Sequence, residues 1–96
     1  MNESILLIDD DKAIAHMAQL MLTSRGYIVE ATCNPEDALK IIRDRPEEFD
    51  LIITDMTMPR MTGVALFERV KKIRPEIPVI ICSGYNAMIS EKEAEQ

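Results

Sequence analysis

The sequence predicts an α/β fold with a doubly wound parallel sheet in a three-layer α/β/α arrangement. Short apolar runs of strand length alternate with longer amphipathic runs along the 96 residues. Strict alternation of this kind implies right-handed crossovers and parallel strands. Three of the strand-like runs are continuously apolar, which is typical of strands that helices cover on both faces.

The first strand and helix come from the first third of the chain. Ser4–Ile8 is too compact for a helix and rich in leucine and isoleucine, so it predicts a strand. Gly26 is expected to cap the helix that follows. Tyr27–Ala31 alternates between polar and apolar residues, as a half-exposed edge strand does. The first helix has one apolar stripe, formed by Ile14, Met17, Ala18, Met21 and Leu22.

A second helix and a third strand follow. Asn34 and Pro35 suit the N-cap and the first helical position. Pro46 is expected to end this helix, and Asp50–Asp55 is the predicted third strand. The buried face of the helix should carry Ala38, Leu39, Ile41 and Ile42.

The remaining segment predicts a loop, two helices and one strand. Met58–Gly63 is rich in turn residues and predicts a loop. The helix after it should end before Pro75, and Pro78–Cys82 is the predicted fourth strand. Ser90–Glu93 resembles a capping box, so a fourth helix is expected at the C-terminus. The buried positions of the third helix are Leu66, Phe67, Val70 and Ile73.

Composition indicates one soluble globular domain. Hydrophobic residues make up 47% of the chain and charged residues 29%. No apolar run approaches the length of a membrane span, and the N-terminus lacks the pattern of a signal peptide. We therefore expect a cytoplasmic protein that does not insert into membranes. A net charge of −6 argues against nucleic-acid binding by this segment, because such binding needs a basic surface.

A few residues suggest chemistry but have a simpler structural explanation. Cys33 and Cys82 lack metal-type spacing, and the predicted fold separates their strands too far for a disulfide, so free thiols are expected. His16, the single histidine, should point to solvent. Met17 and Met21 lie on the apolar stripe of the first helix and are expected to pack in the core.

Oxygen-bearing side chains follow three of the predicted strands. Asp9 and Asp10 come after the first, Asp55 ends the third, and Ser83 follows the fourth. The carboxyl ends of parallel strands meet at one sheet edge, where ligands bind in open α/β folds. Close carboxylates repel one another unless one is protonated or a cation binds. Mg²⁺ suits such oxygen ligands, and a carboxylate beside it can act as a nucleophile toward phosphorus. Asp11 is expected only to cap the first helix.

These residues resemble the receiver domain of two-component response regulators over nearly the whole chain, with motifs in family order and at family spacing. The Gly84–Asn86 stretch is most similar to the receivers of hybrid sensor histidine kinases. The matching motifs are Ile5–Asp11, Leu51–Asp55, Met58–Gly63 and Val79–Gly84.

The resemblance implies a role for each matched residue. Asp55 would accept a phosphoryl group from the phosphohistidine of a histidine kinase or phosphotransfer protein. Asp10 and the backbone carbonyl of Thr57 would bind Mg²⁺ together with Asp55, and Asp9 would bind it mainly through water. Ser83 would hydrogen-bond the phosphoryl group and so report phosphorylation. The domain would not be an enzyme beyond its own phosphorylation and dephosphorylation.

The family pattern also extends further than this sequence. The resemblance implies a flavodoxin-like strand order of 2-1-3-4-5, in which the fifth strand ends in a lysine. Residues 1–96 are expected to form a receiver domain in the order 2-1-3-4, with the fifth strand and helix missing and the chain stopping inside the fourth helix. An apolar fourth strand at the sheet edge would then offer a surface for self-association, as would the fourth-helix face.

Two alternatives to a phosphorylated switch stay open. One is a pseudo-receiver, a protein-interaction module that accepts no phosphate. The presence of Asp10, Asp55 and Ser83 argues against it, whereas the missing lysine keeps it open. The other is a phosphatase similar to the haloacid dehalogenases, with Asp9 as nucleophile and Asp11 as the second acid of an Asp-x-Asp motif. That class needs a later lysine, a downstream acid pair and a larger chain.

Overall fold

The computed structural model describes residues 3–82. The predicted alternation of strands and helices is confirmed over this range, whereas the predicted fourth helix lies outside it. In chain order, the elements are β1 (Ser4–Ile8), α1 (Lys12–Ser24), β2 (Ile28–Thr32), α2 (Pro35–Asp44), β3 (Leu51–Asp55), α3 (Gly63–Ile73) and β4 (Val79–Cys82).

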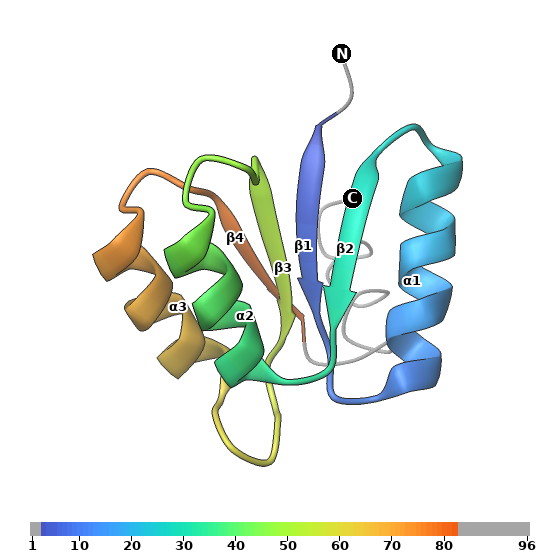
Figure 1. Cartoon of the computed structure of the whole chain (residues 1–96). Coiled ribbons are helices and arrows are strands. Elements are labelled where there is room, and N and C mark those ends of the chain that lie inside the picture. Colours follow the sequence, from blue (N-terminus) through green and yellow to red (C-terminus); the bar gives the residue numbers. More distant parts are fainter. Residues whose placement is uncertain (1–2, 83–96) are drawn as a thin grey trace, which may run out of the picture.

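The four strands form one parallel sheet in the order β2-β1-β3-β4. This is the predicted order, and all four strands point toward the lower edge of Figure 1. Ile8 at the end of β1 pairs with Thr32 of β2 and with Thr54 of β3. Asp55 pairs with Cys82, the last residue of β4. The register therefore brings the residues that follow each strand to a single edge of the sheet.

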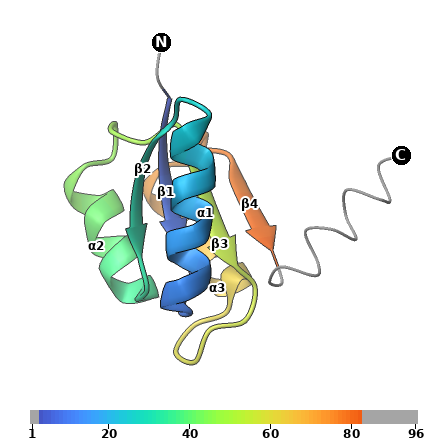
Figure 2. The same cartoon turned by 90° about the vertical axis from the view of Figure 1, so that its right-hand side faces the viewer.

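Helices cover both sides of the sheet, which confirms the three-layer arrangement. Figure 1 shows α2 and α3 on one face and α1 on the other, and Figure 2 looks onto α1 lying across the sheet. The main core lies between the sheet and the α2–α3 pair. Its fully buried members include Leu6, Ile8, Ala38, Ile42, Ile52, Leu66, Val70 and Ile77.

The α1 side is less covered than the sequence predicted. Met17 and Met21 are 54% and 49% exposed, so the prediction that they pack in the core is wrong. The reason is that α1 lies mainly over β2, and Ala15 is its buried residue. Met21 borders an apolar groove between α1 and the β3–β4 half of the sheet. Within residues 3–82 that half is covered only on the α2–α3 face, and Ile80 is 44% exposed.

The predicted capping residues at the helix ends are confirmed. The side chain of Asp11 caps α1 by accepting hydrogen bonds from the N–H groups of Ala13 and Ile14 at 2.9 and 3.2 Å. Asn34 caps α2 in the same way, through the N–H of Glu36 at 2.9 Å. Gly26 has a φ of +97°, a conformation that glycine adopts without strain, and it turns the chain from α1 into β2.

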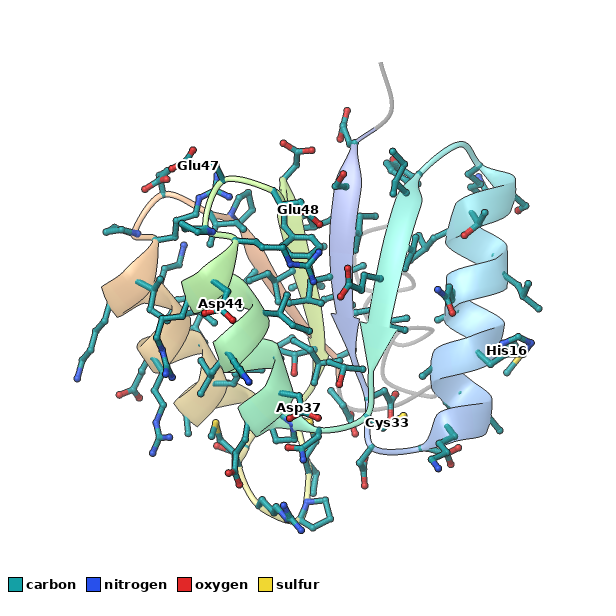
Figure 3. The ribbon with its side chains drawn as sticks, viewed as in Figure 1. His16, Cys33, Asp37, Asp44, Glu47 and Glu48 are labelled. Atoms are coloured by element: carbon teal, nitrogen blue, oxygen red, sulfur yellow. The ribbon has the colours of Figure 1, made fainter. Side chains whose placement is uncertain are left out.

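The predictions on the two cysteines and on the histidine are confirmed. Cys33 and Cys82 are free thiols. His16 is exposed, and Figure 3 shows its side chain on the outer face of α1, away from the sheet. The expected self-association through β4 stays a prediction.

Candidate functional site

Three carboxylates meet at the carboxyl edge of the sheet. Asp9 and Asp10 follow β1, and Asp55 is the last residue of β3. One oxygen of each lies within 4.8 Å of the oxygens of the other two. Asp9 is buried, Asp55 is half-buried and Asp10 is exposed. The convergence that the sequence predicted for these side chains is therefore confirmed.

The backbone around the cluster fixes two of these carboxylates. Oδ1 of Asp9 accepts a hydrogen bond from the N–H of Asp11 at 2.9 Å. Oδ1 of Asp55 accepts one from the N–H of Met56, also at 2.9 Å. The N–H of Gly63 donates to the carbonyl of Met56 at 2.7 Å, which holds the start of α3 against the end of β3. These bonds orient the acids before any ligand arrives.

Electrostatic crowding is visible at Asp9. Burial raises the pKa of its carboxyl above the ordinary value, and the charges of Asp55, Asp10 and Asp11 raise this pKa further. The hydrogen bond from the Asp11 N–H lowers the pKa of Asp9 but does not cancel the rise. Ionisation of Asp9 in the absence of a cation therefore places a negative charge in surroundings that disfavour it.

The raised pKa of Asp9 predicts that, in the absence of Mg²⁺, Asp9→Asn changes the free energy of unfolding by an amount that depends on pH. Below the ordinary pKa of 3.8, Asp9 is neutral in both the folded and the unfolded chain, so its ionisation does not affect the free energy of unfolding. As the pH rises from there, the unfolded chain releases the proton first, so the free energy of unfolding of the wild type falls until the raised pKa is passed. The asparagine side chain of the variant can still accept the bond from the Asp11 N–H without carrying a charge. We expect Asp9→Asn to be the more stable protein at neutral pH, with the difference vanishing at acid pH.

Urea unfolding of both proteins across the acid-to-neutral range measures this difference. Adding Mg²⁺ should stabilise the wild type more than the variant, because a ligand that binds only the folded state stabilises it in proportion to its occupancy. Asp44→Asn removes an exposed carboxylate at the far end of α2 and serves as the control. A constant offset at all pH values would show that Asp9 carries no raised pKa.

The donor set fits a hard divalent cation. All three side chains offer carboxylate oxygens, which Mg²⁺ prefers over nitrogen or sulfur ligands. The exposed position of Asp10 leaves room for water, and Mg²⁺ usually keeps several waters in such sites. A bound cation would also relieve the repulsion that raises the pKa of Asp9.

Two further predicted site residues have different outcomes. Thr57 is exposed in the loop that follows β3, two residues beyond Asp55. Its role through the backbone carbonyl stays a prediction. Ser83, the predicted switch residue, lies outside the described residues.

One side of the site was not predicted from the sequence. Strand β2 ends at the same edge, so Cys33 and Asn34 lie beside Asp10, and Figure 3 shows Cys33 at this edge. Arg60, from the loop between β3 and α3, borders the same cleft. The parallel arrangement predicts this position for the end of β2, but Cys33 and Asn34 lack the carboxylate or hydroxyl that marks the other strand endings.

Comparison with known proteins identifies the family. The sequence model described as "Response regulator receiver domain" matches residues 5–96. The chain belongs to this family, whose members are the receiver domains of two-component signalling systems. Phosphorylation and Mg²⁺ binding are features of the family, and the acidic cluster described above occupies the expected edge of the sheet.

Several characterised proteins are similar along most of this chain. The DNA-binding transcriptional regulator NtrC of Azospirillum brasilense is 37% identical over 93 residues, which is 97% of this chain and 19% of the relative. The transcriptional regulatory protein GlrR of Escherichia coli (strain K12) is 34% identical over 92 residues, 96% of this chain and 20% of the relative. The sensor kinase CckA of Brucella abortus is 34% identical over 82 residues, 85% of this chain and 9% of the relative. The chain thus spans about a fifth or less of the length of these relatives.

Solved structures agree with the family. A response regulator receiver domain protein from Clostridium thermocellum superposes with a TM-score of 0.82 at 33% identity, covering 95% of this chain and 75% of that one. Its match supports the flavodoxin-like order of the four strands. Among residues 3–82, none of the helices combines the length and apolarity that a membrane span requires.

Proposed function

We propose that this chain is the phosphoacceptor of a two-component phosphorelay and that Asp55 takes the phosphoryl group. The observation that carries the proposal is the convergence of Asp9, Asp10 and Asp55 within 4.8 Å at the carboxyl edge of the sheet. A lone carboxylate there would only end a strand. Three together favour the binding of a cation, and a cation beside a carboxylate favours chemistry at an anionic phosphoryl group.

Asp55 is the phosphoacceptor that the resemblance to the receiver family implies. Its Oδ1 accepts a hydrogen bond from the Met56 N–H, which orients the carboxylate at the end of β3. In the transfer, a carboxylate oxygen of Asp55 bonds to phosphorus while the phosphorus–nitrogen bond of a phosphohistidine breaks. The electron pair returns to the imidazole, which takes up a proton. The product is an aspartyl phosphate.

The other predicted residues would serve this transfer. Asp10, Asp55 and the carbonyl of Thr57 would hold Mg²⁺, and Asp9 would act mainly through water. When bound, Mg²⁺ supplies positive charge that neutralises the phosphoryl oxygens. Ser83 would donate a hydrogen bond to the attached phosphoryl group, and two pre-existing arrangements of its surroundings would shift in population.

The partner in this proposal is a histidine kinase or a phosphotransfer protein in the cytoplasm. The similarity to both transcriptional regulators and a sensor kinase supports a position in a phosphorelay, since receivers occur in both kinds of relative. The domain acts as a signalling switch, with no turnover of a separate substrate.

Covalent labelling tests the proposal. The protein is incubated with Mg²⁺ and a small acyl phosphate, trapped with borohydride, and digested to locate the modified residue by mass spectrometry. Modification at position 55 is expected. Modification at Asp9, or steady hydrolysis of phosphate esters, would indicate a phosphatase similar to the haloacid dehalogenases. An unmodified but folded protein would favour the pseudo-receiver.

A further inference from the structure

A cleft opens beside the acidic cluster on the side of α2. It has a volume of about 210 Å³, which is enough for several water molecules. The start of α2 forms one wall and the loop between β3 and α3 forms the other. It is lined by Asp10, Cys33, Asn34, Pro35, Pro59 and Arg60. Of these lining residues, Asp10 carries a negative charge and Arg60 the positive one.

A weak contact joins Arg60, on the wall of this cleft, to the start of α2. Its Nη1 lies 3.9 Å from Oε1 of Glu36, in the first turn of α2. The two side chains are 67% and 61% exposed. Exposed ion pairs at such a distance contribute little to stability, so the guanidinium can leave Glu36 at low cost. Because arginine stays charged at any physiological pH, Arg60 brings a permanent mobile cation to the edge of the site.

The acidic cluster has opposite electrostatic effects on Mg²⁺ and on the phosphodonor. Three carboxylates attract Mg²⁺, but they repel the dianionic phosphoryl group that must reach Asp55. A cation on the adjacent cleft reduces this repulsion and raises the local concentration of the anion. The positive charge of Arg60 also repels Mg²⁺ and so weakens its binding. Glu36 offsets the charge of Arg60, so it favours Mg²⁺ binding and disfavours the approach of the anionic phosphodonor.

We propose that Arg60 steers the anionic phosphodonor to the acidic cluster and that Glu36 restrains it. Arg60 is then a positioning residue that acts through its charge and needs no contact with the reacting atoms. The proposal rests on the proposed function for the phosphodonor, whereas its consequence for Mg²⁺ depends only on the cluster and the cleft.

Four single variants test this proposal. Arg60→Gln removes the positive charge and Arg60→Lys keeps it. Glu36→Gln removes the carboxylate that pairs with Arg60. Arg25→Gln is the matched control, because Arg25 is an exposed arginine that follows α1, at the opposite end of the sheet. The rate constant for phosphorylation by a small acyl phosphate is measured at saturating Mg²⁺, and Mg²⁺ affinity is measured by calorimetry without a donor.

The expected effects have opposite signs for the two ligands. A unit charge beside a binding site in water-like surroundings changes the local concentration of a divalent ion by about fivefold at low salt. Arg60→Gln should therefore slow phosphorylation about fivefold and tighten Mg²⁺ binding by a similar factor. Glu36→Gln should speed phosphorylation and weaken Mg²⁺ binding. Arg60→Lys should behave as the wild type, and salt near 1 M should remove all these differences because it shortens the screening length to about 3 Å.

The outcomes separate this proposal from the proposed function. If the wild type is not labelled at Asp55, the proposed function fails, and the Mg²⁺ titrations still test Arg60. Slower phosphorylation by Arg60→Gln with unchanged salt dependence would indicate a structural role and overturn the steering proposal. Equal Mg²⁺ affinities and equal rates for Arg60→Gln and Arg25→Gln would overturn it as well.

Discussion

Asp55→Asn is expected to lower phosphoryl incorporation by roughly a thousandfold or more, to the background. The metal ligands only assist the attack of the nucleophile on phosphorus, so the transfer cannot proceed once the nucleophile is removed. The fold should survive. The asparagine side chain keeps an oxygen that can accept the bond from the Met56 N–H, which Asp55 accepts at 2.9 Å. Without Mg²⁺ the variant should be at least as stable as the wild type, because one of three mutually repelling charges is gone.

The measurement pairs labelling with thermal unfolding in the presence and absence of Mg²⁺. The wild type should gain stability from Mg²⁺, and Asp55→Asn should gain less, since the ion loses one charged ligand. Asp44→Asn is the control, with both labelling and the Mg²⁺ effect unchanged. A folded Asp55→Asn protein that is labelled as efficiently as the wild type would remove Asp55 from the role of acceptor.

The strands could be predicted because the signals that set them are local. Apolar runs of four to six residues, separated by helices with clear caps, predict parallel strands, whereas the order of these strands came from the resemblance to receiver domains. The predicted ends of the strands agree with β1, β2, β3 and β4 to within one residue. The three acids could be placed for the same reason, since each directly follows or ends a strand.

The part of the sheet that α1 covers could not be predicted in the same way. An apolar stripe identifies the side of a helix that avoids water but not the part of the sheet beneath it. Helix α1 lies mainly over β2, so Met17 and Met21 are half exposed although they share a stripe with Ile14 and Leu22. Met58 and Met61 show the opposite case. They stand in a loop but are 5% and 8% exposed, because the β3–α3 loop folds back on the core.

The cleft beside Asp10 depends on relations that sequence does not show. Arg60 and Glu36 are separated by more than twenty positions and belong to a loop and a helix. Their approach follows from the parallel crossover that carries α2 past the end of β3. Only the structure therefore places an arginine on the cleft next to the acidic cluster.

Gly63→Ala is expected to damage both the fold and the site. A Cβ at this position would lie 2.5 Å from the carbonyl oxygen of Asp55 and 3.0 Å from Cα of Met56. Both neighbours are backbone atoms, so no side-chain rotation can relieve the contact. We expect a loss of about 3 kcal/mol in the free energy of unfolding, at the upper end of the usual cost of overpacking.

The same displacement should weaken Mg²⁺ binding, because the backbone that must move is that of Asp55 itself. Gly26→Ala provides the contrast. Gly26 has a φ of +97° and no heavy atom within 4 Å of an added Cβ, so its replacement costs about 1 kcal/mol of backbone strain far from the site. Urea unfolding with and without Mg²⁺ should show that Gly26→Ala keeps the full stabilisation by Mg²⁺ while Gly63→Ala loses most of it. Equal Mg²⁺ stabilisation in the two variants would mean that the junction of β3 and α3 does not position Asp55.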